Sequence, residues 1–127
     1  MKNAEYYIKN LEMIPHVEGG YFKESFLSED NVRENKKLWS SIYFLLRTGE
    51  VSNFHRLKSD ELWYYHDGEA LTIYMITPEG DFITKQTWYR YREWRISTSL
   101  SSKGIYIWFC HEQRRLFFSW LYGFTSI

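Results

Sequence analysis

Apolar positions near the start of the chain follow the spacing of a helix. Within residues 3–14 they fall on one helical face, and Pro15 then ends the pattern. The residues of this face are Tyr7, Ile8, Leu11 and Ile14. The pattern predicts a short amphipathic N-terminal helix that stops before the proline.

The apolar positions change character further along the chain. Residues 38–46, 62–65 and 71–76 are runs of β-branched and aromatic side chains, a composition typical of strands. Turn-forming residues separate these runs. The turns are Gly49-Glu50, Asp67-Gly68 and Pro78-Glu79-Gly80. Short strands at regular spacing predict an all-β protein, an antiparallel sandwich or barrel.

Length, cysteine content and charge exclude several classes of protein. The 127 residues suit one domain, and no run of them approaches the roughly 20 apolar residues of a transmembrane helix. The first residues lack the basic and apolar regions of a signal peptide. Cys110 alone forms no internal disulfide, and zero formal net charge gives no support for a nucleic-acid partner. We therefore expect a cytoplasmic protein with neither a membrane nor a nucleic-acid partner.

The end of the chain differs in composition from the rest. Up to Gln86 there are 10 basic and 14 acidic side chains, a net charge of −4, whereas residues 87–127 have 6 and 2, a net charge of +4. Four of the six Trp lie in this tail, which contains no Pro. Its alternating aromatic and Arg residues at 88–92 would suit a nucleic-acid strand, but a shift of the reading frame accounts for them better. The single domain 1–127 therefore divides into a body, residues 1–86, and an anomalous tail.

One spacing in the body is specific. Five residues separate Gly49 from His55, Leu57 stands two positions later, and Glu61 and Gly68 follow. This spacing resembles the first conserved motif of the cupin superfamily of small β-jelly-roll barrels, with Leu57 where a second His usually stands. Alternate residues of a strand share a face, so positions 55 and 57 point together, and a returning strand can bring Glu61 into the same cavity. His55 and Glu61 alone would bind a divalent metal weakly, so a metal site is kept as an alternative.

A wider set of residues resembles one small subgroup of that superfamily, often designated cupin five, whose members are mostly uncharacterised. The similar residues are Pro15-His16, Glu18-Gly19-Gly20-Tyr21-Phe22, Glu24, residues 41–46, Ser52, residues 54–61, Trp63 and His66. Leu is usual at position 57 in this subgroup, whereas Val17 replaces a usual Pro and Tyr64 a usual His. The resemblance covers residues 3 to about 85 and implies a cupin jelly roll that forms a homodimer.

Each candidate residue around the motif has a functional and a structural interpretation. His55 is either an acid or base or a core His bonded to a carbonyl, and we favour the functional role because Glu61 and Arg56 are close in sequence. Glu61 is rarely buried unless paired, so it either lines a pocket or pairs with Arg56. Trp63 and Tyr65 share a strand face with Glu61 and are assigned to the cavity wall.

Three further residues complete the set of predicted ligand contacts. Arg56 follows His55 directly. His66 alternates to the other face of its strand unless a bulge intervenes. Tyr21 is a ligand-binding candidate, although Tyr21 and Glu24 could equally be determinants of the fold.

These residues predict a protein that binds a small polar molecule inside the barrel, with an activity that the sequence does not specify. One alternative is an isomerase or epimerase acting on a sugar-like substrate. In it His55 would be the acid or base and Glu61 would orient it for proton transfer next to a carbonyl. The other alternative is a metal-dependent oxygenase with a divalent metal at His55 and Glu61.

The tail suggests a reading-frame explanation for its own composition. A cupin needs a second motif near Pro-x-Gly to complete the barrel, and residues 87–127 lack any Pro. Read one nucleotide later, every Trp codon becomes a Gly codon, and suitable codons for residues 101–108 would encode Val-Pro-Lys-Gly-Tyr-Ile-Phe-Gly. We therefore predict a one-nucleotide shift near Lys85 or Gln86, in the gene or its record, which would leave the C-terminal strands incomplete or non-native.

Overall fold

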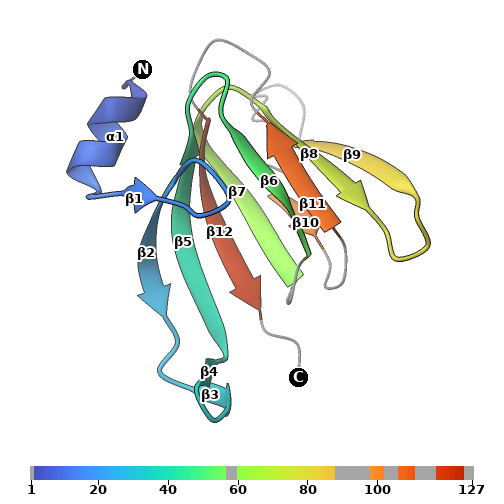
Figure 1. Ribbon diagram of the computed structural model, residues 1–127. Coiled ribbons are helices and arrows are strands. Elements are labelled where there is room, and N and C mark those ends of the chain that lie inside the picture. The colour runs from blue at the N-terminus through green and yellow to red at the C-terminus, as the bar shows by residue number, and fades with distance from the viewer. Residues whose placement is uncertain (1, 57–59, 88–97, 102–105, 111–116, 125–127) are drawn as a thin grey trace.

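The protein is described by a computed structural model that covers residues 2–56, 60–87, 98–101, 106–110 and 117–124 (Figure 1). One short helix precedes a series of strands. The elements are α1 (Ala4–Asn10), β1 (Ile14–Pro15), β2 (Tyr21–Leu27), β3 (Asn31–Arg33), β4 (Lys36–Lys37), β5 (Trp39–Leu46), β6 (Val51–Arg56), β7 (Asp60–Gly68), β8 (Leu71–Ile76), β9 (Phe82–Thr87), β10 (Thr98–Ser101), β11 (Tyr106–Cys110) and β12 (Phe117–Phe124). None of the helical segments in these ranges has the length and apolar character needed to cross a bilayer.

The predicted N-terminal helix is confirmed, with a capped start and an early end. Asn3 precedes α1, and its side-chain oxygen accepts a hydrogen bond from the N–H of Tyr6 (2.9 Å), which satisfies one of the free donors of the first turn. Glu12 has a φ of 53°, in the left-handed region, and the helix does not continue past it. Ile14, which shares the predicted helical face, instead begins β1 and pairs with Phe22.

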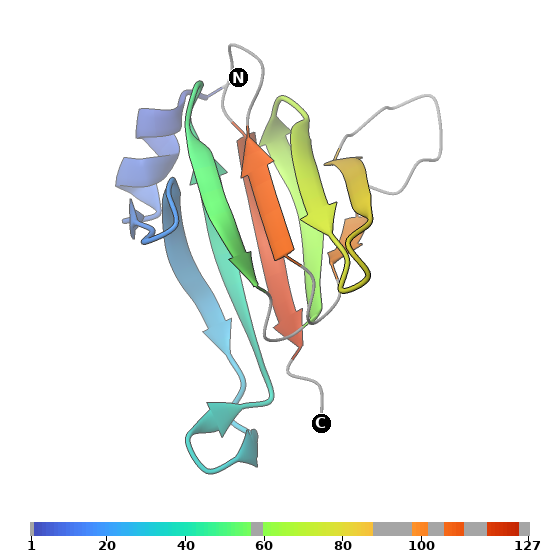
Figure 2. The ribbon, with the colours of Figure 1, turned by 45° about the vertical axis from the view of Figure 1, so that its right-hand side comes forward.

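The strands form two antiparallel sheets that face each other. The larger sheet has the order β1-β2-β5-β12-β7-β10 and the smaller the order β6-β11-β8-β9, while β3 and β4 form a separate hairpin. In Figure 2 the strands of the smaller sheet lie in front of those of the larger one. This architecture, all-β with one short helix, confirms the predicted jelly-roll fold.

The core between the sheets consists of side chains that alternate along their strands. Phe44 and Leu46 of β5 and Trp63 of β7 pack there against β8, and all are buried. The intervening Leu45 points the other way and is also fully buried, because α1 covers that side of the larger sheet. The end of β5 is therefore apolar on both faces, which explains why it appears in the sequence as an uninterrupted apolar run.

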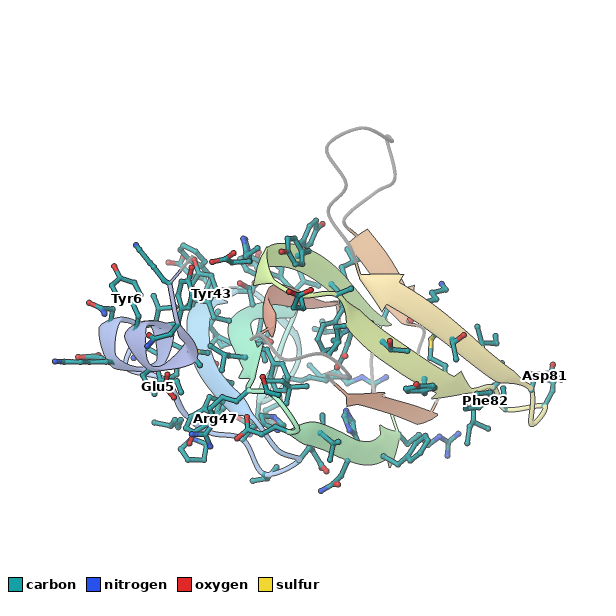
Figure 3. All side chains as sticks on the ribbon, turned by 90° about the horizontal axis from the view of Figure 1, so that it is seen from above. Glu5, Tyr6, Tyr43, Arg47, Asp81 and Phe82 are labelled. Atoms are coloured by element: carbon teal, nitrogen blue, oxygen red, sulfur yellow. The ribbon has the colours of Figure 1, made fainter. Side chains whose placement is uncertain are left out.

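The helix side of the larger sheet forms a second, smaller core. Leu45 packs there with Ala4 and Met13, and Tyr43 lies at its border. Figure 3 shows Tyr43 and Arg47 on the side of the molecule that carries α1, and Phe82 at the far end, on the β8–β9 hairpin. The hydroxyl of Tyr7 donates a hydrogen bond to a carboxylate oxygen of Asp67 on β7 (2.6 Å), which ties the helix to a central strand.

The tail supplies strands to the middle of both sheets. β12 lies between β5 and β7, and β11 lies between β6 and β8. The backbone of residues 117–124 pairs along its whole length with residues 39–46. With these strands present both sheets are continuous. The frame shift concerns the coding sequence rather than the backbone, and it stays a prediction.

Candidate functional site

Backbone register places His55 and Ser52 on the face of the smaller sheet that looks into the core. The β11 residue paired with His55 is also paired with Met75, and the one paired with Ser52 is also paired with Ile73. Directly opposed residues share a face, and Ile73 and Met75 belong to the buried core. A bulge between these two positions of β6 places both residues inward although they are three positions apart.

Backbone register also places three predicted residues on the inner face of the larger sheet. Across β12, Tyr65 shares a register row with Phe44, and Glu61 and Trp63 follow at alternate positions of the same strand. Trp63 is 1% exposed, and its ring meets that of Phe44 edge to face at a centroid separation of 6.0 Å. Trp63 and Tyr65 thus lie where a cavity wall is expected.

Glu61 is partly buried on this inner face. Burial raises the pKa of its carboxyl group from 4.5 to about 7. A close guanidinium would lower this pKa instead. Arg56, the alternative partner considered above, is exposed on β6 next to His55. Near neutral pH, Glu61 therefore occupies both protonation states, which is the condition for exchanging a proton with a ligand.

His55 is partly buried and oriented by its own strand. Its Nδ1 lies 2.8 Å from the backbone carbonyl oxygen of Asn53. A carbonyl only accepts hydrogen bonds, so Nδ1 must carry the hydrogen that is donated. In the neutral ring Nε2 is then the acceptor and the basic nitrogen.

His16, which the sequence reasoning did not assign to the site, also lies against the inner core. Its ring meets Phe22 and Phe44 edge to face, at 5.1 and 5.8 Å between ring centroids. The backbone N–H of Glu18 donates to Nδ1 of His16 (3.1 Å), so the neutral ring carries its hydrogen on Nε2. Burial, together with the nearby charge of His55, lowers the pKa of His16.

A tight loop between β1 and β2 brings the two histidines together. The carbonyl oxygen of Glu18 accepts a hydrogen bond from the N–H of Asn53 on β6 (2.7 Å). Gly19 has a φ of 115°, and a Cβ at this position would lie 2.0 Å from the backbone oxygen of Val51. Only glycine permits this contact, so the Gly19-Gly20 pair of the sequence seats the loop on β6.

A buried hydroxyl accompanies these groups. Ser52 is 1% exposed, and its Oγ has no hydrogen-bond partner within the part of the chain that the structure describes. A buried polar atom of this kind points to a ligand or water that completes its hydrogen bonding. Ser52 contributed to the family resemblance but had no assigned role, because its burial is a tertiary property.

Two of the predicted ligand contacts lie on the opposite face of the larger sheet. Tyr21 pairs with Leu45 and packs in the small core under α1, with the Arg47 guanidinium 4.9 Å from the centre of its ring. His66 is exposed, and its ring lies 6.0 Å from that of Tyr43, which borders the same core. The structure therefore does not bring these residues together with His55, and the packing of Tyr21 fits its alternative role as a fold determinant.

A divalent metal needs several ligating side chains close together. Within the described ranges, no three His, Cys, Asp or Glu side chains are gathered closely enough to hold a metal ion. Nδ1 of His16 already accepts a backbone hydrogen bond, and Nδ1 of His55 donates one. The Nδ1–H of His55 leaves its Nε2 able to bind a metal, so His55 and Glu61 stay an alternative pair of ligands, while Leu57 and His111 lie outside the described ranges.

Comparison with known proteins gives a family and a fold. A family model described as Cupin superfamily (DUF985) matches residues 5–112. An X-ray crystal structure of a Shewanella oneidensis protein is 43% identical, with a TM-score of 0.92, and the match covers 100% of this chain and 80% of that one. A hypothetical protein from Leishmania major is 25% identical (TM-score 0.85, covering 99% and 83%). No curated protein matches.

A more distant likeness concerns the fold alone. Oxalate decarboxylase from Bacillus subtilis is 15% identical, with a TM-score of 0.63, and the match covers 94% of this chain and 29% of that enzyme. At this identity, the likeness shows a shared barrel and leaves the chemistry of the site to its own residues.

Proposed function

From the membership of the chain in the DUF985 family of the cupin superfamily, we propose that it binds a small polar molecule between its two sheets. The proposed contacts are His55, Glu61 and His16, with Trp63 and Tyr65 as the wall. The observation that carries the proposal is the placement of Ser52, His55 and Glu61 on the two inner faces, beside the buried apolar core. Binding sites for small molecules have this composition, a mainly apolar lining with a few polar groups.

The energetic cost of these interior groups supports the proposal. Burial raises the pKa of Glu61, so the fold loses stability when this carboxyl group ionises. The buried hydroxyl of Ser52, with no partner among the described residues, carries a desolvation cost. A core that served only to hold the fold would be more stable with apolar side chains at both positions. A ligand that hydrogen-bonds to them would remove the cost.

Proton transfer on a bound molecule is the second candidate function. It is favoured by the pKa of about 7 for Glu61, which suits a group that gains and loses a proton at neutral pH. His55, with Nδ1–H held by a carbonyl, would act through its basic Nε2. Such a pair suits proton abstraction next to a carbonyl, as in an isomerase or epimerase.

The resemblance to the family also implies a homodimer, and we propose one here. Large apolar side chains are exposed on and next to β1 and β2, at one side of the larger sheet, as expected of a surface that another chain covers. They are Ile14, Val17, Phe26 and Leu27. Light scattering coupled to gel filtration distinguishes a dimer near twice 15.6 kDa from a monomer.

Binding is tested by NMR titration with a panel of small molecules, reading the indole N–H signal of Trp63. The panel contains neutral, anionic and cationic members, namely dihydroxyacetone, glycerate and ethanolamine. We expect one of them to shift the Trp63 signal in wild type, and His55→Ala to weaken that response. His66→Ala, a change of the same type on the opposite face, is the matched control. If no member moves the signal, or if both variants behave alike, the proposed site is wrong.

Turnover is measured separately from binding. Proton abstraction next to a carbonyl exchanges that hydrogen for deuterium in heavy water, which proton NMR detects on dihydroxyacetone. Exchange that is fast in wild type and lost in both Glu61→Gln and His55→Ala would support the enzyme. Binding without exchange would leave the protein as a ligand-binding module.

A further inference from the structure

His16 and His55 offer opposite hydrogen-bonding groups to the interior. The N–H of Glu18 donates a hydrogen bond to Nδ1 of His16, so the hydrogen of that ring is on Nε2. Nδ1 of His55 donates to the carbonyl of Asn53, so in the neutral form of that ring Nε2 is the acceptor. Because its Nδ1 accepts a hydrogen bond, the His16 ring is neutral in this arrangement, and His55 is close enough for its charge to lower the pKa of His16.

The His16 ring is held rigidly on both its backbone and its side chain. The N–H of His16 donates to the carbonyl of Gly20 (2.9 Å), and its own carbonyl accepts from the N–H of Gly19 (3.0 Å). The edge-to-face contacts with Phe22 and Phe44 fix the plane of the ring. A donor held in this way costs little further entropy when a ligand binds.

We propose that His16 is a specificity residue of this site, which presents Nε2–H as a fixed donor and, opposite the acceptor His55, selects an uncharged hydroxycarbonyl molecule. This inference rests on the proposed binding function. A carbonyl oxygen of the ligand accepts from His16, and a neighbouring hydroxyl donates to Nε2 of His55. The hydroxyl of Ser52 on the same inner face, which has no hydrogen-bond partner among the described residues, suits a further ligand oxygen.

The charge of the ligand follows from the groups around it. Burial raises the pKa of Glu61, and among the residues that the structure describes no cation counteracts it, so an anionic ligand would be repelled by the ionised form of this carboxylate. An ammonium group can only donate hydrogen bonds, and in place of the carbonyl it would leave the Nε2–H of His16 facing another donor. An uncharged molecule with both an acceptor and a donor satisfies both histidines.

The first test measures the tautomer of His16 without any ligand. Long-range proton–nitrogen correlation spectra distinguish a ring protonated at Nε2 from one protonated at Nδ1 and from the charged ring. The His16 signals are identified by their loss in His16→Asn. We expect the Nε2–H form at pH 7 in the full chain, and finding either the Nδ1–H form or a charged ring overturns the inference.

The second test compares two substitutions that each keep one half of the ring. Asn places its side-chain oxygen where Nδ1 stands, so His16→Asn keeps the acceptor for Glu18 and loses the donor to the ligand. Gln places its amide N–H near the position of Nε2, so His16→Gln keeps the donor and loses the loop contact. His66→Asn is the matched control on the opposite face.

Dihydroxyacetone is the probe, with glycerate and ethanolamine as its charged counterparts. We expect dihydroxyacetone to bind wild type most tightly, His16→Asn to weaken it about tenfold, the worth of roughly one good hydrogen bond, and His16→Gln to keep most of the affinity. Equal binding by wild type and His16→Asn, or a preference for a charged probe, overturns the inference but leaves the binding function standing. Failure of all three probes to bind wild type overturns the binding function itself.

Discussion

Glu61→Gln is expected to stabilise the protein at alkaline pH and to leave its stability unchanged in acid. The folded state raises the pKa of Glu61 from 4.5 to about 7, so it binds the proton more tightly than the unfolded chain does. The contribution of the protonated carboxyl is therefore complete below about pH 4.5 and is lost as pH rises through about 7. At about 1.4 kcal/mol per pKa unit, the rise from 4.5 to about 7 corresponds to a full loss of at most roughly 3 to 4 kcal/mol, an upper bound because the side chain is partly exposed.

Urea unfolding at pH 4, 6 and 8 measures this effect. The free energy of unfolding of Glu61→Gln should match wild type at pH 4 and exceed it increasingly at pH 6 and 8, because glutamine keeps the shape without the charge. Glu79→Gln, in the exposed turn after β8, controls for the loss of one negative charge. A difference between Glu61→Gln and wild type that is constant across this range, or that favours wild type at pH 8, would refute the assignment of Glu61 to a desolvated inner face.

Three further changes test the loop, the helix contact and the buried hydroxyl. Gly19→Ala should lower the free energy of unfolding by at least about 3 kcal/mol, because its Cβ meets a backbone oxygen and its φ is positive, whereas Gly49→Ala, with open space around it but a φ of 80°, should cost only the backbone strain of about 1 to 2 kcal/mol. Tyr7→Phe should cost about 1 to 2 kcal/mol in thermal unfolding, since it removes the hydrogen bond to Asp67. Ser52→Ala should leave stability unchanged or raise it by up to about 1 kcal/mol, and a clear loss would show that the hydroxyl has a structural partner.

Much of the fold is predictable from local pattern. The helical spacing before Pro15 predicts α1, and the apolar runs 38–46 and 71–76 correspond to β5 and β8. Ile14 lies in β1, where it pairs with Phe22, and not in the predicted helix. The helix ends before it because the backbone of Glu12 adopts the left-handed conformation. Such a local choice depends on a partner strand that the sequence pattern does not identify.

The site is only partly predictable, because it depends on which face each residue occupies. Alternation along β7 correctly groups Trp63 and Tyr65 with the core. The face of Tyr21 follows from its register with β5, which the sequence of β2 does not contain. Ser52 and His55, three positions apart, would lie on opposite faces of a regular strand, and only the bulge in β6 places both inward.

His16 shows most clearly why reasoning from one motif stops short of the site. It precedes His55 by 39 positions, and no spacing rule connects a loop residue to a strand so far along the chain. The connection is made by a backbone hydrogen bond from Asn53 to Glu18 and by the absence of a side chain at Gly19. These same two residues also set the two tautomers, since Glu18 donates to one ring and Asn53 accepts from the other. One loop-to-strand contact thus both positions the histidines and makes their hydrogen-bonding groups opposite, which is what recognition of a molecule with both a donor and an acceptor requires.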